Sequence, residues 1–158
     1  MKSLQVYLGT PNEHNTYKAK VIGVILALWI INNTPETIGK KVTLYTDNQS
    51  VIAAILSTKA TPGQYLIDAL RLAIKTTRCN LTIRWISGHS KVKGNEAVDK
   101  IAKDAADGRS STMATLPHIL RRPLPKSASA IKQGFEKTLK DKWATIWDAS
   151  PRKPRIAQ

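Results

Sequence analysis

The stretch Val42-Thr43-Leu44-Tyr45-Thr46-Asp47-Asn48 contains the signal that decides the fold of this chain. The residues from Val42 to Thr46 are β-branched, apolar or aromatic, and such a run is typical of a strand. Asp47 and Asn48 follow directly, and short polar side chains at this place are good N-caps for a helix. A strand that passes straight into a helix predicts an α/β domain, in which functional residues gather at the carboxyl ends of the strands.

Strand and helix signals alternate on both sides of this stretch. Residues 17–33 carry apolar side chains at helical spacing, and residues 81–86 read as a second strand, with Trp85 expected in the core. Because helical segments separate the Leu44 strand from the Ile83 strand, we expect these two strands to pair in parallel. Further helices are expected over 48–57, 64–77, 95–107 and 128–147, and a further strand over 4–8.

The 158-residue chain is strongly basic, with 25 Lys and Arg against 11 Asp and Glu and a formal charge of +14. Such an excess predicts an anionic partner, of which nucleic acid is the commonest. The longest apolar run, Val21 to Ile31, is too short to span a bilayer. Cys79 is the only cysteine, which excludes an internal disulfide and a cysteine-rich zinc site. Because no secretory signal opens the sequence, we expect an intracellular location, cytoplasmic or nuclear.

The chain divides by charge near residue 108. Residues 1–108 carry 14 basic and 8 acidic residues, whereas residues 109–158 carry 11 basic and 3 acidic ones. The shift begins at Gly108-Arg109-Ser110-Ser111-Thr112, a composition that is typical of a domain edge followed by a linker. We therefore expect an α/β domain over 1–108, and a basic linker with a C-terminal helix over 109–158.

Two longer strings are specific enough to compare with known families. One is Leu44-Tyr45-Thr46-Asp47-Asn48-Gln49-Ser50, and the other is Arg84-Trp85-Ile86-Ser87-Gly88-His89-Ser90-Lys91-Val92-Lys93-Gly94-Asn95-Glu96-Ala97-Val98-Asp99. In this order and separation they resemble the ribonuclease H type 1 family, and most closely the domain at the end of fungal-type retroelement reverse transcriptases. The helix over 17–33 and the tail over 116–155 look similar to that group as well, so the resemblance covers nearly all of the chain.

The resemblance implies a mixed sheet flanked by helices and a nuclease site for RNA–DNA hybrids that holds two Mg²⁺ or Mn²⁺ ions. Several carboxylates surround such a metal pair, because hard cations prefer oxygen ligands. By this resemblance Asp47 and Asp99 are the third and fourth carboxylates, and His89 is the loop histidine that assists proton transfer or product release. Nucleic-acid contacts are expected from Asn48, Gln49, Ser87, Gly88, Lys91, Lys93 and Asn95.

Two departures from the family pattern change this expectation. The first two strands of the family fold, which include the first metal-bridging Asp, have no counterpart, so a strand at 4–8 would be the third. The glutamate of the family's first helix is replaced by Lys20 in the string Tyr17-Lys18-Ala19-Lys20. The Lys20 ammonium can occupy the place of a metal and pair with Asp47 and Asp99. We therefore expect metal binding at these two carboxylates to be weak or lost.

The missing strands also leave a pairing edge on the Leu44 strand, and a homodimer or an exchange of strands would cover it. Three functions remain open at this point. The first is a nucleic-acid-binding protein in which cleavage is weak or lost, and the charge and the retained loops favour it. The second is an active magnesium-dependent hybrid endoribonuclease whose site is completed by another chain, which Lys20 opposes. The third is a non-enzymatic interaction protein derived from a retroelement.

Overall fold

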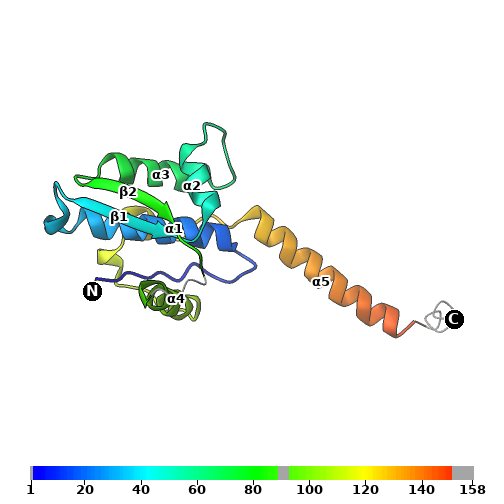
Figure 1. Cartoon of the computed structure of the whole chain (residues 1–158). Coiled ribbons are helices and arrows are strands. Elements are labelled where there is room, and N and C mark those ends of the chain that lie inside the picture. Colours follow the sequence, from blue (N-terminus) through cyan, green and yellow to red (C-terminus); the bar gives the residue numbers. More distant parts are fainter. Residues whose placement is uncertain (1, 89–92, 151–158) are drawn as a thin grey trace.

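Helices and strands alternate along most of the chain, as the sequence predicts. The structure is a computed structural model that describes residues 2–88 and 93–150. Its main elements are α1 (Thr16–Asn32), β1 (Lys41–Thr46), α2 (Gln49–Leu56), α3 (Gln64–Lys75), β2 (Asn80–Trp85), α4 (Lys93–Ala106) and α5 (Ala128–Asp148). Short 3-10 turns lie at Pro35–Thr37, Met113–Thr115 and His118–Leu120. In Figure 1 the first six of these main elements form a layered body, from which α5 projects.

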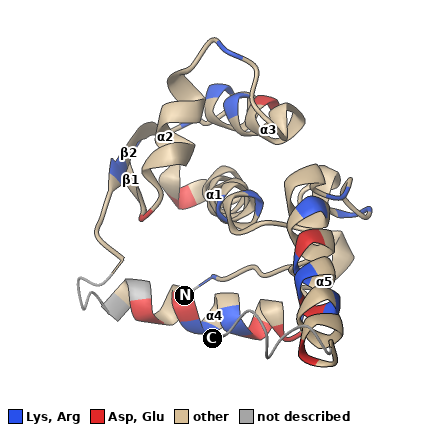
Figure 2. Ribbon diagram, turned by 90° about the vertical axis from the view of Figure 1, so that its right-hand side faces the viewer, with Lys and Arg blue, Asp and Glu red and all other residues tan. Residues whose placement is uncertain are grey.

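The helix α1 lies between α3 and α4 in both views of the molecule (Figure 1 and Figure 2). It begins after Asn15, whose Oδ1 accepts a hydrogen bond from the Lys18 amide at 2.9 Å. Because neighbours cover it on several sides, apolar residues occupy more than one of its faces. The buried apolar residues of α1 are Val21, Ile22, Val24, Ile25, Leu26 and Leu28. They share one core with Leu66, Ile67 and Leu70 of α3.

The strands β1 and β2 form a parallel pair in which Leu44 lies opposite Ile83, so the predicted pairing is confirmed. The helices lie on one side of this pair (Figure 2), and Leu44 belongs to the core. Tyr45 and Arg84, which are opposite each other in the register, are exposed. In the described part of the chain the sheet has two strands. Their carboxyl ends lie at one edge, where Asp47 and the loop after β2 follow.

Residues 4–8 do not form the strand that their alternating pattern predicts. This segment runs past Ser110 and Ser111 instead. The Gln5 amide donates to Ser111 Oγ at 3.0 Å, and the Tyr7 amide donates to Ser110 Oγ at 2.8 Å. Serine hydroxyls therefore satisfy amides that a neighbouring strand would otherwise have paired. The apolar side chains of this segment still pack against the core, so the alternation indicated burial correctly and strand pairing wrongly.

The segment after residue 108 returns to the body before α5 begins. Leu116 and Leu120 are 2% and 6% exposed and belong to the same core cluster as α1. The Trp29 indole donates to the Thr115 carbonyl at 2.8 Å, which holds this segment against α1. The domain boundary at residue 108 stays a prediction. Leu116 and Leu120, which follow residue 108, belong to the same core as residues that precede it.

A polar cluster attaches the start of α5 to the turn before α1. The Glu13 carboxylate lies 2.7 Å from Lys126 Nζ. Lys18 is 7% exposed, and its Nζ lies 3.0 Å from His14 Nδ1 and donates to the Pro125 carbonyl. Burial lowers the pKa of Lys18 and is the chief cause that lowers the pKa of His14. A neutral His14 ring can accept from the Lys18 ammonium, so the cluster joins α1 to the segment that leads into α5.

Glu13 is expected to make the stability of this attachment depend on pH in acid. Hydrogen bonds from Lys126 and from the Thr10 amide hold the pKa of Glu13 at about 2, below its usual value of 4.5. A carboxylate with a depressed pKa contributes stability above its unfolded-state pKa, and that stability is lost as the pH falls toward the folded-state value. We expect Glu13→Gln to flatten the curve of unfolding free energy between these two pH values, as measured by urea unfolding.

The control for this measurement is Glu36→Gln, because Glu36 forms no ion pair within the described residues. It should leave the acid part of the curve close to that of the wild-type protein. Identical curves for the wild type and Glu13→Gln would show that Glu13 does not stabilise the attachment.

Candidate functional site

Asp47 lies at the carboxyl end of β1, where the sequence places the candidate site. The preceding residue, Thr46, is buried, and its carbonyl accepts from the Ile86 amide at 2.9 Å. Asn48 is the N-cap of α2, because its Oδ1 accepts from the Val51 amide at 3.1 Å. The Asp47 carboxylate therefore does not act as the helix cap, which was the other role that its position between strand and helix allowed.

The Asp47 carboxylate forms an ion pair with Lys20 Nζ. Lys20 lies near the start of α1, so the contact joins the central helix to the end of the sheet. The side chains of Lys20 and Asp47 are 35% and 29% exposed, which places the pair at the border between core and solvent. A pair this exposed contributes only about 1 kcal/mol or less to stability, and its importance lies in where the positive charge is held. The predicted pairing of Lys20 with Asp47 is thus present in the structure.

Two residues at the end of β2 also approach Asp47. The Trp85 indole donates to the Asp47 carbonyl at 3.2 Å. A Cβ atom added to Gly88 would lie 3.4 Å from Asp47 Oδ2, so a glycine lets the loop backbone pass close to this carboxylate. The expectation that Trp85 lies in the core was wrong, because the residue ends its strand and is 49% exposed. Nothing in the sequence pattern distinguished this indole from a core residue.

Asp99 lies on α4 and is exposed. Within the described part of the chain it forms no ion pair, with Lys20 or with any other residue. The helix α4 also contributes no residue to the hydrophobic core cluster, so little packing fixes it relative to the sheet. The expected convergence of Asp99 with Asp47 therefore stays a prediction.

The remaining candidate residues lie at the start of α2, after β2 and at the start of α4. Gln49 is exposed at the start of α2, and Ser87 and Gly88 follow β2 after one intervening residue, Ile86. Lys93 and Asn95 belong to the first turn of α4, which begins two residues earlier than the sequence predicts. His89 and Lys91 lie outside the described residues, so the roles that the sequence assigns to them stay predictions.

The described residues around Asp47 do not fit a pair of Mg²⁺ ions. Magnesium prefers several oxygen ligands, and two such ions need several carboxylates between them. Among the residues that the structure describes, no three His, Cys, Asp or Glu side chains gather into a metal-binding group. The Asp47 carboxylate already bonds an ammonium group, which holds a positive charge at the place where a cation would bind. The donor set therefore favours the lysine over a metal pair.

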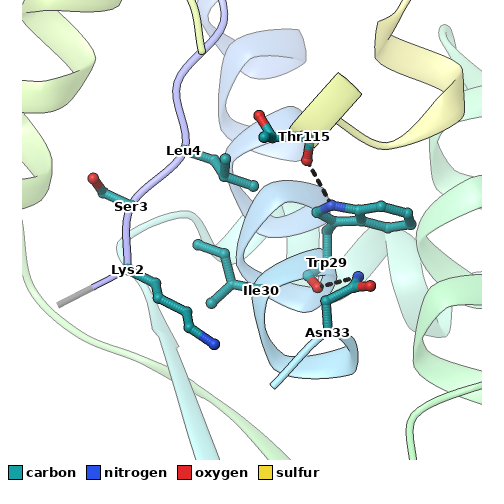
Figure 3. A pocket seen from close by; sticks show the side chains of 7 residues that line it. All are labelled: Lys2, Ser3, Leu4, Trp29, Ile30, Asn33 and Thr115. Atoms are coloured by element: carbon teal, nitrogen blue, oxygen red, sulfur yellow. Dashed lines mark hydrogen bonds between the residues drawn. The ribbon is translucent and has the colours of Figure 1, made fainter. Parts of the chain in front are cut away.

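A shallow pocket of about 340 Å³ lies near the other end of α1 (Figure 3). Its lining includes Lys2, Leu4, Trp29 and Thr115, and it contains no acidic side chain, histidine or cysteine. Trp29 follows Lys20 by nine residues, or roughly 13 Å along the helix axis. The pocket is therefore separate from Asp47.

Fold and site together define the class of the protein. A parallel strand pair that ends at an acidic residue, with helices on one side, defines an α/β domain whose site lies at the strand ends. The family model described as RNase H matches residues 5–107, and the chain belongs to the RNase H family. Membership associates the chain with the binding or cleavage of RNA–DNA hybrids.

Comparison with curated proteins and with solved structures adds no relative to this assignment. No curated protein and no solved structure matches the chain at a significant level. In the described residues, no helix is both long and apolar enough to cross a membrane. The family assignment therefore rests on the match to residues 5–107 alone.

Proposed function

We propose that this protein binds RNA–DNA hybrids or related nucleic acid through an RNase H domain in which cleavage is weak or lost. The observation that carries the proposal is the ion pair between Lys20 and Asp47. In the family pattern a glutamate would stand at the position of Lys20 and would add negative charge to the site. Here the same position adds a positive charge and engages Asp47.

The sign of this charge opposes the binding of two divalent cations. Two unit charges about 4 Å apart interact by roughly 4 kcal/mol at an effective dielectric constant of about 20. Partial exposure of Lys20 and Asp47 reduces this figure considerably. Even a reduced repulsion adds to the loss of a ligand, because Lys20 stands where the family pattern has a glutamate. Mg²⁺ or Mn²⁺ binding is therefore expected to be too weak to support efficient cleavage.

The charge of the chain supports the binding half of the proposal. A formal charge of +14 on 158 residues attracts the phosphate backbone at long range. The loop string that follows β2 retains the family pattern and supplies candidate phosphate contacts at Lys91 and Lys93. We further propose that the domain derives from a retroelement reverse transcriptase and acts where hybrids occur, in the cytoplasm or nucleus.

Binding of a labelled RNA–DNA hybrid is expected to weaken at least tenfold when salt rises from about 50 to 200 mM. Displaced counterions cause this dependence, so its slope reports the number of phosphates in contact. Fluorescence anisotropy at several salt concentrations measures the slope. No binding at low salt, or a flat dependence on salt, would leave the third class, an interaction protein, as the better explanation.

The double substitution Lys91→Ala and Lys93→Ala tests whether the phosphate contacts come from these two lysines. It is expected to weaken binding and to reduce the salt slope by about two contacts. Its control is Lys40→Ala with Lys75→Ala, since Lys40 precedes β1 and Lys75 ends α3, at the opposite end of the strands from Asp47. An equal loss in both double variants would indicate attraction by overall charge and no interface at the loop.

The edge of β1 that faces away from β2 favours a second candidate function, a hybrid endoribonuclease whose site is completed by another chain. Within the described residues no strand pairs with that edge, so a second chain can add a strand there. A homodimer or strand exchange at this place is the arrangement in which another chain would complete the carboxylate set. Hybrid cleavage that rises with the square of protein concentration and depends on Asp47 would support this candidate.

A further inference from the structure

The long helix α5 leaves the body after its first two turns (Figure 1). Ala130 is 2% exposed, and the Asn15 side-chain amide donates to Ser129 Oγ at 3.0 Å. A Cβ atom added to Gly134 would lie 3.0 Å from Asn12 Oδ1, so the helix still touches the body at this position. Every residue from Phe135 to Asp148 is exposed. The segment from Phe135 to Trp147 therefore packs against no other helix or strand among the described residues.

This exposed half of α5 is not polar. The large apolar side chains along α5 are exposed by 39% to 66%, and they are Ile131 in its first half and Phe135, Leu139, Trp143, Ile146 and Trp147 in its second half. At about 100° per residue these side chains cover about 160° of the circumference, centred on Leu139. Phe135 and Trp143 lie one turn on either side of that centre. The helix thus presents a continuous apolar row, called here the α5 row, of the kind that normally packs against another helix.

We propose that the α5 row is the interface with a second copy of this chain, in which the two α5 helices pack antiparallel around Leu139. Four-residue spacing makes the row a ridge of the type that packs against an equal ridge at a crossing angle of about −50°. Because the positions at four-residue spacing, from Ile131 to Trp147, are symmetric about Leu139, one helix can serve as the partner of another. The two-fold axis then passes beside Leu139 of both copies.

The area of the α5 row suits such a dimer. Three aromatic side chains of about 150–250 Å² each, exposed by 39% to 66%, and three aliphatic ones give roughly 600 Å² per helix. Stable protein interfaces bury about 800 Å² per partner. A pair of these helices is therefore somewhat smaller than a standard interface, so the dimer should depend on concentration in the micromolar range.

The charges on α5 also suit a second copy. The helix carries four lysines and three acidic residues, so two copies repel each other far less than the strongly basic remainder of the chain would. Glu136 and Lys140 lie on the same flank of the α5 row, on opposite sides of Leu139. Antiparallel packing therefore brings Glu136 of one copy toward Lys140 of the other. An anionic membrane surface is a poorer partner, because Glu136 flanks the α5 row and would approach it as well.

Sedimentation equilibrium of the full chain tests the interface. We expect a monomer–dimer equilibrium for the wild type and dimerisation at least tenfold weaker for Leu139→Glu. The matched control is Thr145→Glu, which adds the same charge on the side of α5 away from the row and should leave the equilibrium unchanged. Circular dichroism and the melting temperature show whether each variant folds. A monomeric wild type would overturn the proposal. A dimer that Leu139→Glu leaves intact would also overturn it, and would indicate that the two copies meet at the edge of β1 instead.

A charge exchange tests the antiparallel arrangement. Glu136→Lys and Lys140→Glu are each expected to weaken the dimer about threefold, and the double variant should restore it. Failure of the double variant to restore the dimer would overturn the antiparallel packing. Flotation with vesicles of phosphatidylserine and phosphatidylcholine tests whether the α5 row binds an anionic membrane surface instead of a second copy. If the wild type binds vesicles and stays monomeric, the dimer proposal is overturned, and α5 is a helix that binds the membrane surface.

Discussion

Leu28→Ala is expected to lower the free energy of unfolding by about 3–5 kcal/mol, the largest loss of any substitution considered for this protein. Leu28 is 0% exposed on the central helix α1. Neighbours on several sides of that helix prevent the surroundings from closing the cavity that a smaller side chain leaves. The same core positions Lys20, so the loss would also loosen the site.

Urea unfolding followed by circular dichroism measures this loss, and Leu56→Ala is the matched control. Leu56 is 78% exposed at the end of α2, and its truncation removes the same atoms from a surface position. We expect the control to change the unfolding free energy by about 0.5 kcal/mol or less. Equal losses in the two variants would contradict the placement of α1 at the centre of the core.

Lys20→Glu is expected to have the largest effect on the site. Without metal it replaces an ion pair by two neighbouring carboxylates and should destabilise the protein by about 1–2 kcal/mol, since both side chains are partly exposed. With Mg²⁺ or Mn²⁺ the two carboxylates can share a cation. At a metal concentration ten times the dissociation constant, binding restores about 1.4 kcal/mol.

The melting temperature with and without Mg²⁺ measures this response. The wild type should show no specific rise with Mg²⁺, because the Lys20 ammonium holds the Asp47 carboxylate. The control is Lys40→Glu, which makes the same change of charge before β1, at the far end of the strand from Asp47. A rise of the same size in the wild type and in Lys20→Glu would show that Lys20 does not exclude the metal.

Local sequence patterns were sufficient to predict most of the fold. Leu44 and Ile83 were expected on paired parallel strands and are direct neighbours in the register. Helix bounds agree within two residues for α1, α3 and α5, because capping residues and apolar spacing act locally. The strand predicted over residues 4–8 was wrong, because an alternating pattern reports only which side chains are buried. Ser110 and Ser111 accept hydrogen bonds from the amides of this segment in place of a neighbouring strand.

The candidate site could be predicted only in part. Lys20 and Asp47 were expected together from the family pattern, and the structure shows their ion pair. The exposed indole of Trp85 and the buried ammonium of Lys18 were missed. Lys18 lies on the apolar stripe one turn before Ile22, and this position was the available signal for its burial. Partners such as the Pro125 carbonyl come from a distant part of the chain, and no local pattern indicates them.

Cleavage of a uniformly labelled RNA–DNA hybrid, with Mg²⁺ or Mn²⁺ and with Asp47→Asn as control, tests the central claim most directly. The claim is that this RNase H domain binds hybrid while the Lys20–Asp47 pair leaves it unable to cut efficiently. We predict that the RNA strand stays intact at protein concentrations that saturate binding, with wild type and control alike. Efficient cleavage by the wild type that disappears in Asp47→Asn would contradict the claim.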